Sequence, residues 1–264
     1  ALYPGPGKNL YNPASRQNRL VPMTDLESYF ENNPGNLINK WRHYFDVYER
    51  YFHPYRGTDV QILEIGVRHG GSLQMWKHYF GPRARIYGVD INPRSRELEE
   101  EQIEIFIGDQ EDLGFLAELQ DKLPRLDIVI DDGGHTMVQQ IRTFEALFPH
   151  LSDPGIYVCE DTHTSYWPTF GGGLRKPDTF IEYSKKFVDD LHAWHSKDPE
   201  DGLDVTDITR TLDSVHFYDS MVVFEKRQRT PPEISHTGKK RLPRFRATPL
   251  PGDGAGLGSK SQDD

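Results

Sequence analysis

Two stretches of this sequence end an apolar run in adjacent acids. Residues 126–135 read LDIVIDDGGH and residues 157–167 read YVCEDTHTSYW. Short apolar runs of this kind form buried parallel strands, and open α/β sheets bind ligands beyond the carboxyl ends of such strands. Carboxylates that converge there repel one another unless a cation shares the space, and oxygen ligands favour Mg²⁺ or a similar hard ion. The two stretches therefore indicate a metal site, with His135 beside it as a base.

A purely structural interpretation of these acids is also open. Asp131 and Asp132 precede two glycines, so their carboxylates could cap the following helix. His135 could likewise cap that helix or pack against it. The second acidic pair, Glu160 and Asp161, lies on what would be the adjacent strand and favours the metal site over the cap.

Alternating strands and helices must position these acids, and this alternation predicts a doubly wound, Rossmann-like, mostly parallel α/β sheet. Residues 213–226 contain two further short strands around Asp219 and Ser220, spaced as an antiparallel hairpin. Such a hairpin usually closes the sheet of a class I methyltransferase and not that of a dinucleotide dehydrogenase. The parallel strands are expected at residues 59–66, 84–90, 103–109, 126–132 and 155–161.

The turn after the first strand could hold a cofactor. Glu64 and Gly66 end the strand, and Gly70 and Ser72 open the next helix, so backbone can approach a ligand at a helix N-terminus. A dinucleotide fingerprint needs a second glycine where this chain has Arg68. The pattern E-x-G-x-x-x-G-G instead resembles the first motif of class I S-adenosylmethionine (SAM) methyltransferases. Glycine-rich turns are also common structural devices.

Acids at the ends of later strands extend this expected cofactor site. Asp90 lies about two dozen residues after the glycines, where an acid reaches the ribose hydroxyls of an adenosine-bearing ligand. It could instead cap the turn at Asn92. Asp109 or Gln110 is placed to approach the adenine, and Asp131 completes the expected cofactor-binding residues.

The remaining elements suggest a domain with irregular ends. Residues 1–35 are expected to form an arm with one short helix, which Thr24 and Glu27 cap. The domain should span residues 36–226, and residues 227–264 should form a disordered tail. Three- and four-residue spacing predicts an amphipathic helix from Asn36 to Phe52, whose apolar face carries Ile38, Trp41, Tyr44, Phe45, Tyr48 and Phe52.

Composition excludes several classes of protein. The 264 residues carry a net charge of −10, which argues against general nucleic-acid binding. The single cysteine, Cys159, cannot form a disulfide framework and fits a reducing compartment. The first residues lack the apolar core of a signal peptide, and no apolar run reaches transmembrane length. We therefore expect a cytoplasmic protein without membrane partners.

The chain from about residue 36 to residue 226 resembles the metal-dependent sugar O-methyltransferases of macrolide and aromatic polyketide antibiotic pathways. The resemblance rests on KWRHYFDVYERYF, ILEIGVRHGGSLQMWKHYF, IYGVDINP, GDQEDLGFL, IDDGGHTMVQQ and EDTHTSYWPTFGGG. It implies SAM in the glycine turn, Mg²⁺ held by Asp132, Glu160 and Asp161, and His135 as general base. It also implies a small-molecule glycoside acceptor and a homo-oligomer.

Other residues are candidates for acceptor contact. Glu49 matches a region of the family that supplies another acid near the acceptor, and His163, Tyr166 and Trp167 are expected to line the pocket. Methylation of a catechol-like or polyketide hydroxyl and a non-catalytic SAM-binding scaffold are the alternatives. An NAD-dependent protein is disfavoured by Arg68 and by the closing hairpin. The acceptor and the methylated hydroxyl do not follow from the residues.

Overall fold

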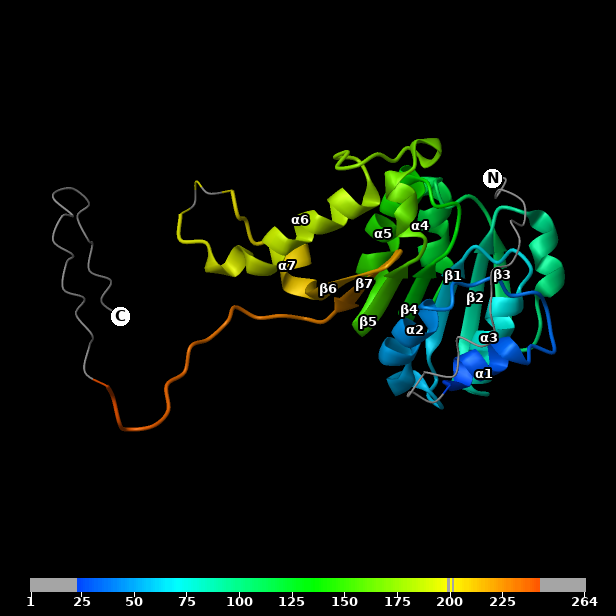
Figure 1. Cartoon of the computed structure of the whole chain (residues 1–264), viewed down its shortest axis with the longest axis horizontal. Helices are drawn as coiled ribbons and strands as arrows, with labels where there is room; N and C mark the ends of the chain where they lie inside the picture. The colour runs from blue at the N-terminus through cyan, green and yellow to red at the C-terminus, as the bar shows by residue number, and fades with distance from the viewer. Residues whose placement is uncertain (1–22, 199, 201, 243–264) are drawn as a thin grey trace, which may run out of the picture. The chain divides into compact units, whose positions relative to one another are not determined.

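The computed structural model describes residues 23–198, 200 and 202–242 (Figure 1). Within this part, the chain divides into a compact unit that ends at Pro231 and a segment that begins at Pro232. Residues 1–22 of the expected arm and residues 243–264 of the expected tail lie outside the described residues. Among the described helices, none is both long and apolar enough to cross a membrane.

A seven-stranded sheet forms the centre of the compact unit, in the order β3-β2-β1-β4-β5-β7-β6. Strands β1 to β5 pair in parallel, whereas β7 is antiparallel to both β5 and β6. The prediction of a mostly parallel sheet closed by an antiparallel hairpin is therefore confirmed. The strands are β1 Gln61–Ile65, β2 Arg85–Asp90, β3 Ile103–Ile107, β4 Leu126–Asp131, β5 Leu151–Cys159, β6 Leu212–Tyr218 and β7 Met221–Lys226.

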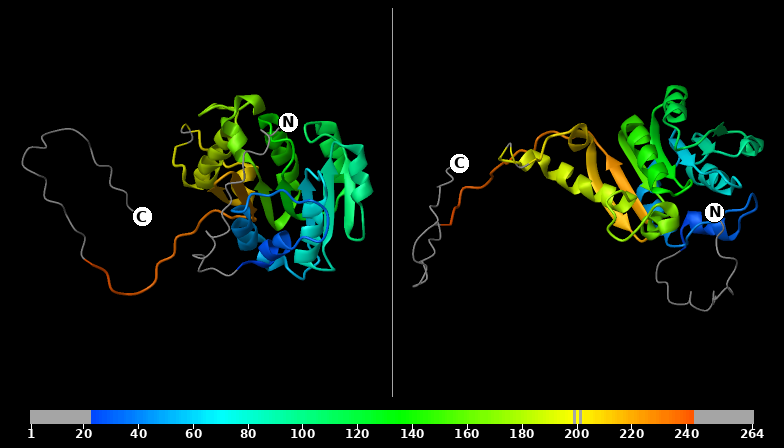
Figure 2. Two further views of the ribbon diagram at one scale, coloured as in Figure 1. Left: turned by 45° about the vertical axis from the view of Figure 1, so that its right-hand side comes forward. Right: turned by 90° about the horizontal axis from the view of Figure 1, so that it is seen from above.

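Helices pack in a layer on each face of the sheet (Figure 1 and Figure 2). Helices α1, α2 and α3 share one buried cluster with the sheet, and α4, α5 and α6 share another. Short 3₁₀ turns connect several of these elements. The helices are α1 Asp25–Glu31, α2 Tyr44–Phe52, α3 Gly71–Phe80, α4 Leu113–Lys122, α5 Met137–His150, α6 Phe180–His192 and α7 Asp207–Thr211.

Alternation along the strands explains why two layers are needed. In β4, Ile128 and Ile130 pack with the α1–α3 layer, whereas Val129 between them packs with the α4–α6 layer. All three side chains are fully buried. Because successive side chains of a strand point to opposite faces, a strand that is apolar at every position must be covered on both sides. The central strands thus require helices above and below.

The helix expected over residues 36–52 is shorter than the pattern predicts. Helix α2 begins only at Tyr44, and residues 37–41 have no regular secondary structure. The backbone oxygens of Asn36 and Leu37 lie close over Gly71, where a Cβ atom would come within 2.4 Å of the Asn36 oxygen. Tertiary contact therefore holds this segment extended across the start of α3. As a result Trp41 is 49% exposed and does not belong to the buried face of the helix.

The capping box expected for the first helix is confirmed. Thr24 Oγ1 accepts a hydrogen bond from the backbone N–H of Glu27, and the Glu27 carboxylate accepts one from the Thr24 N–H. These two bonds satisfy donors that the first turn of a helix leaves unpaired. The helix itself packs beside α2 and α3 in the same layer.

Candidate functional site

The carboxyl ends of β1, β4 and β5 lie side by side at the point where the strand order reverses. The N–H of Asp132 donates to the Ile65 oxygen at the end of β1, at 3.0 Å, and the N–H of Glu160 donates to the Asp131 oxygen at 2.9 Å. These bonds continue the sheet register by one residue beyond each strand. The glycine turn and the two acidic pairs therefore meet at one edge of the sheet, which is where such sheets bind ligands.

Three side chains form the open part of this acidic site. His135 Nε2 lies 3.5 Å from Asp161 Oδ2 and 3.9 Å from Asp132 Oδ1. One ligand atom from each residue lies within 4.8 Å of the other two. The Nδ1 atom of His135 is buried and has no hydrogen-bond partner in the structure. Asp132 and Asp161 thus each present one carboxylate oxygen to the same space, with His135 Nε2 beside them.

A lysine occupies the opposite side of the same carboxylates. Lys40 Nζ lies 2.6 Å from Asp132 Oδ2, 2.9 Å from Glu160 Oε2 and 3.2 Å from Glu64 Oε1. The Lys40 side chain is only 2% exposed. Burial alone would lower the pKa of Lys40, but Asp132 and Glu160 raise it, and the net pKa lies well above its usual range. This lysine is therefore charged.

One ammonium does not balance the acids around it. Burial and the neighbouring charge of Asp132 raise the pKa of Glu160 well above its usual range, against the lowering effect of Lys40. Burial also raises the pKa of Glu64. A proton on one of these acids or a further cation would relieve this crowding of negative charge. The donor set and its charge thus fit a divalent ion at Asp132 and Asp161, where one oxygen of each faces His135.

Residues 40–48 lead into α2 and form its start. Their side chains donate hydrogen bonds to the acidic residues on the side away from His135. Tyr48 donates to Glu160 Oε1 at 2.5 Å, and Tyr44 donates to Asp161 Oδ1 at 2.8 Å. Trp41 Nε1 donates to the same Asp161 oxygen at 3.1 Å. Both Glu160 oxygens are thereby bonded to Lys40 or Tyr48, so Glu160 lies behind Asp132 and Asp161 and does not join them at His135.

The sequence pattern placed the aromatic residues of this segment on a packing face. It did not reveal that Lys40, Trp41, Tyr44 and Tyr48 donate hydrogen bonds to the acidic residues. A signal is present, because two of the buried rings are tyrosine and not phenylalanine. A buried tyrosine hydroxyl needs a hydrogen-bond partner. Periodicity alone reports which face is buried and does not show what the buried polar atoms contact.

The glycine turn at residues 66–71 is closely packed by the protein's own backbone. Gly66 has φ of +95°, and a Cβ atom there would lie 2.1 Å from the backbone oxygen of Asp132. Gly70 has φ of +77° and begins α3. Glycine is thus required at residue 66 both for its conformation and for close contact with the acidic site.

Asp90 ties this turn to the end of β2. Its Oδ2 atom accepts a hydrogen bond from the Arg68 N–H at 2.8 Å, and its Oδ1 atom accepts one from the Asn92 N–H, also at 2.8 Å. The capping role that the sequence left open is therefore present. The carboxylate remains partly exposed beside the glycine turn, so it is also available to a ligand.

Other expected cofactor residues lie in buried polar contacts. Glu64 accepts hydrogen bonds from Ser72 Oγ at 2.8 Å and from Trp76 Nε1, on α3, at 3.1 Å. Gln110 donates to Asp131 Oδ1 at 3.0 Å and accepts from the Gly134 N–H at 2.7 Å. The carboxylates of Glu64 and Asp131 are thus enclosed and orient their neighbours, whereas Asp109 caps its own turn through the Glu111 N–H.

Burial raises the pKa of Asp131 to about 6, although the hydrogen bond from Gln110 and the charge of His135 lower it. Tyr157, on β5, donates to the second oxygen of the same carboxylate at 3.3 Å. The aspartates at residues 131 and 132 therefore have different roles. Asp131 is buried inside the edge of the sheet, and Asp132 points into the site.

The expected acceptor residues divide into two groups. His163 bonds to Ser220 and has its ring 4.7 Å from that of Trp167, beside the acidic cluster. Tyr166 and Trp167 are 48% and 45% exposed. Glu49 instead bonds to Tyr79 and lies 3.1 Å from His53 Nδ1, so the structure does not bring it to the cluster.

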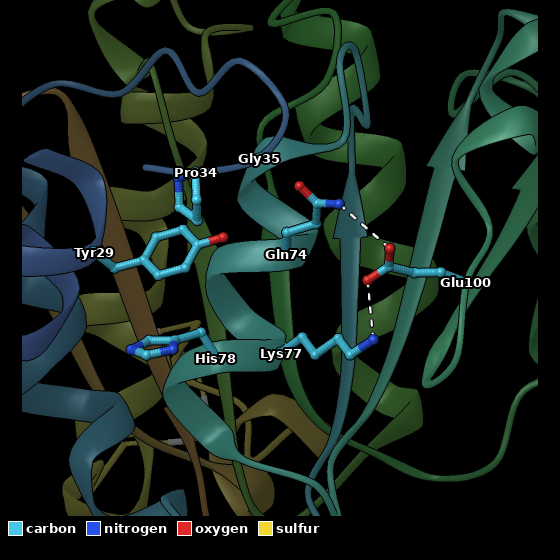
Figure 3. Close-up of a pocket in the computed structure, with 7 residues that line it drawn as sticks. All are labelled: Tyr29, Pro34, Gly35, Gln74, Lys77, His78 and Glu100. Atoms are coloured by element: carbon cyan, nitrogen blue, oxygen red, sulfur yellow. Dashed lines mark hydrogen bonds and ion pairs between the residues drawn. The ribbon is translucent and has the colours of Figure 1, made fainter. Parts of the chain in front are cut away.

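A separate surface hollow of about 310 Å³ lies between α1 and α3 (Figure 3). Lys77 and Gln74 both bond to Glu100 at its rim. None of the expected site residues lines this hollow, so it plays no part in the site. The lining residues are Tyr29, Pro34, Gly35, Gln74, Lys77, His78 and Glu100.

Comparison with known proteins assigns the fold to a class. Residues 63–162 match the family model of a methyltransferase domain. The solved structure of the methyltransferase MycE from the mycinamycin biosynthetic pathway, in complex with Mg and S-adenosylhomocysteine (SAH), superposes with a TM-score of 0.70. It is 34% identical, and the alignment covers 78% of this chain and 55% of that one. The fold is that of a class I methyltransferase.

Curated relatives show more closely which methyltransferases this chain is similar to. An 8-demethyl-8-alpha-L-rhamnosyl tetracenomycin-C 2'-O-methyltransferase of Streptomyces olivaceus is 39% identical over 215 residues, which are 77% of this chain and 55% of the relative. Demethylmacrocin O-methyltransferase of Streptomyces fradiae is 42% identical over 204 residues, which are 72% and 51% of the two chains. Over about three quarters of its length the chain is therefore similar to sugar O-methyltransferases of macrolide and aromatic polyketide pathways. It spans about half the length of these curated relatives.

Proposed function

We propose that this protein transfers a methyl group from SAM to a sugar hydroxyl of a glycosylated small molecule, with Mg²⁺ as cofactor. The observation that carries the proposal is the convergence of Asp132, Asp161 and His135 beside the glycine turn. The chain's relatives include O-methyltransferases of rhamnosyl tetracenomycin and of mycinamicin VI, which supports a glycoside acceptor.

The cofactor would bind along the carboxyl ends of β1 and β2. Gly66 and Gly70 shape the turn, and the partly exposed carboxylate of Asp90 is placed for the ribose hydroxyls. Glu64 and Gln110 support this surface from behind through their buried hydrogen bonds. When bound there, SAM supplies an electrophilic methyl group on a sulfonium.

Asp132 and Asp161 would hold Mg²⁺, and His135 would act as the general base. A sugar hydroxyl is scarcely ionised near neutral pH, so the slow part of the reaction is presenting an oxygen nucleophile in line with the methyl group. When bound, Mg²⁺ supplies positive charge that lowers the pKa of a nearby hydroxyl. His135 Nε2 faces the same space and can take the released proton.

The acceptor would enter beside His163, Tyr166 and Trp167. The exposed parts of the Tyr166 and Trp167 rings offer apolar surface next to the acidic site. Asp161 connects the two regions, because it is bonded to Trp41, which itself lies edge-on to the His163 ring at 6.2 Å. The sugar would therefore lie between aromatic surface and the carboxylates.

The test of this function is methyl transfer with and without the metal. Turnover of SAM should require both a glycoside acceptor and Mg²⁺, EDTA should abolish it, and added Mg²⁺ should restore it. A panel of glycosides, aglycones and catechols would identify the acceptor class. Full activity in thoroughly demetallated protein would refute the metal-dependent mechanism, and activity restricted to catechols would refute the sugar acceptor.

A further inference from the structure

Lys40 is the buried cation that the proposed reaction leaves unexplained. Its ammonium contacts three carboxylates from three neighbouring strands, those of Glu64 within β1, Asp132 just after β4 and Glu160 just after β5. The side chain reaches them from an irregular segment that does not continue α2. Burying a charged side chain in this way is costly unless it is fully paired, as it is here.

The geometry separates the lysine side of Asp132 from the open side. Lys40 binds the Oδ2 atom of Asp132 at 2.6 Å, whereas the Oδ1 atom faces His135. Asp161 shows the same division, because Trp41 and Tyr44 bind its Oδ1 atom while Oδ2 faces His135. Each of the two carboxylates therefore has one oxygen tied to segment 40–48 and one oxygen free to ligate.

We propose that Lys40 is a positioning residue that holds Asp132 in the orientation needed for metal binding, by pairing it with Glu160 and, through Glu64, linking it to the glycine turn. This inference rests on the metal-dependent function proposed above. Lys40 occupies the back of the carboxylates and remains there when the ion binds in front. Without its charge, Asp132 and Glu160 would repel each other and turn their oxygens away from the site.

Calorimetric titration of Mg²⁺ into the full chain, after treatment with EDTA, tests this inference. Lys40→Met keeps the length of the side chain and removes its charge. Because outer partners of metal ligands contribute about 10–100-fold to metal affinity, Lys40→Met should raise the Kd for Mg²⁺ at least about tenfold. Lys77→Met is the matched control, since Lys77 forms a partly exposed ion pair with Glu100 and should leave the Kd unchanged.

If Lys40 only stabilised the fold, its replacement would not change the Mg²⁺ concentration that the folded variant needs for turnover. In Lys40→Met, the Mg²⁺ concentration for half-maximal turnover should rise about tenfold, in step with the Kd. An unchanged Kd would overturn the inference. A lower Kd would also overturn it, because it would show that Lys40 competes with the ion for the carboxylates.

Folding of the variant can be secured by a second change. Lys40→Met combined with Glu64→Gln removes one positive and one negative charge, so the buried cluster keeps its net charge. The double variant should fold, as judged by circular dichroism, and should show the same loss of Mg²⁺ affinity. Failure of the wild-type chain to bind Mg²⁺ would count against the proposed metal-dependent function, whereas equal binding by wild type and variants would refute only the role of Lys40.

Discussion

At the scale of single residues, the site holds two side chains on unusual backbone. His135 has φ of +60° and Asp161 has φ of +53°, in the left-handed region that non-glycine residues rarely adopt. This conformation costs roughly 1–2 kcal/mol per residue, so the surrounding fold must enforce it. Its effect is to turn both side chains toward each other at the open side of the cluster. Strain of this kind is concentrated at functional sites.

His135→Gln should separate binding from proton transfer. The variant should keep its affinity for SAM, because His135 lies at the carboxylates and not in the glycine turn. Its turnover at neutral pH should fall about 10²–10⁴-fold, which is the usual contribution of a general base. The deficit should shrink as the pH rises and the hydroxyl ionises unaided. Steady-state rates from pH 6 to pH 9 would show this, and a near-normal rate at neutral pH would dismiss His135 as the base.

Asp131 should make the stability of the metal-free protein depend on pH. Folding raises its pKa from 3.8 to about 6, so the folded state holds this proton more tightly than the unfolded chain. The stabilising contribution is therefore complete below the unfolded pKa and is lost as the pH rises through about 6. Two pKa units correspond to about 3 kcal/mol.

Asp131→Asn cannot titrate and should remove this dependence. Urea unfolding in EDTA at pH 4 and pH 7 should show the wild type losing roughly 2 kcal/mol relative to the variant as the pH rises, since pH 4 is already slightly above the unfolded pKa. The comparison between the two proteins cancels the other titrating groups. Parallel pH profiles for wild type and variant would contradict the raised pKa.

At the scale of elements, the site depends on how the segment before α2 crosses the glycine turn. Asn36 and Leu37 pack over Gly71, and this contact sets the path that brings Lys40 and Trp41 to the strand ends. The turn itself packs against the backbone after β4. The contacts at Gly71 and Gly66 thus bring the segment before α2, the glycine turn and the end of β4 together around the acidic residues.

Gly66→Ala tests this close packing. The added Cβ would lie 2.1 Å from the Asp132 oxygen and would displace the backbone that carries a proposed metal ligand. Gly57→Ala is the control, because Gly57 also has a positive φ, of +68°, but a Cβ there meets nothing within 4 Å. The control should lose about 1 kcal/mol from backbone strain alone. Gly66→Ala should lose several times more in chemical denaturation, and equal losses would show that the contact is unimportant.

At the scale of the whole molecule, the proposed binding sites lie at one edge of a sheet that helices cover on both faces. Ligands that bind only the folded state must stabilise this entire cooperative unit. The aromatic face of α2 is buried within the same unit, where Phe45, Tyr48 and Phe52 are fully enclosed. That face therefore provides no surface for subunit contact, and homo-oligomeric assembly stays a prediction from the family resemblance.

SAM should raise the melting temperature, and NAD should not. A ligand at one hundred times its Kd stabilises the folded state by about 2.7 kcal/mol. For a domain of this size, that corresponds to a rise of roughly 5–10 °C. Differential scanning fluorimetry with each ligand would measure the shifts. A larger shift with NAD than with SAM would contradict the class of cofactor proposed here.

The sequence by itself determined the sheet, its closing hairpin and the presence of acids at adjacent strand ends. These features are local, because apolar runs and turn residues are encoded in short stretches such as 126–135. The family resemblance added SAM and Mg²⁺ as expectations. The pattern also predicted an amphipathic helix over residues 36–52, of which residues 44–52 are helical.

Only the tertiary structure decided which oxygens face the site. Lys40 is 92 residues from Asp132 and 120 from Glu160, so no local pattern connects them. Periodicity predicted helix at residues 36–41, but contact with Gly71 holds that segment extended. The direction of each carboxylate follows from its hydrogen-bond partners in space. Those partners come from distant segments, and a buried charge takes its orientation from whichever of them the fold brings near.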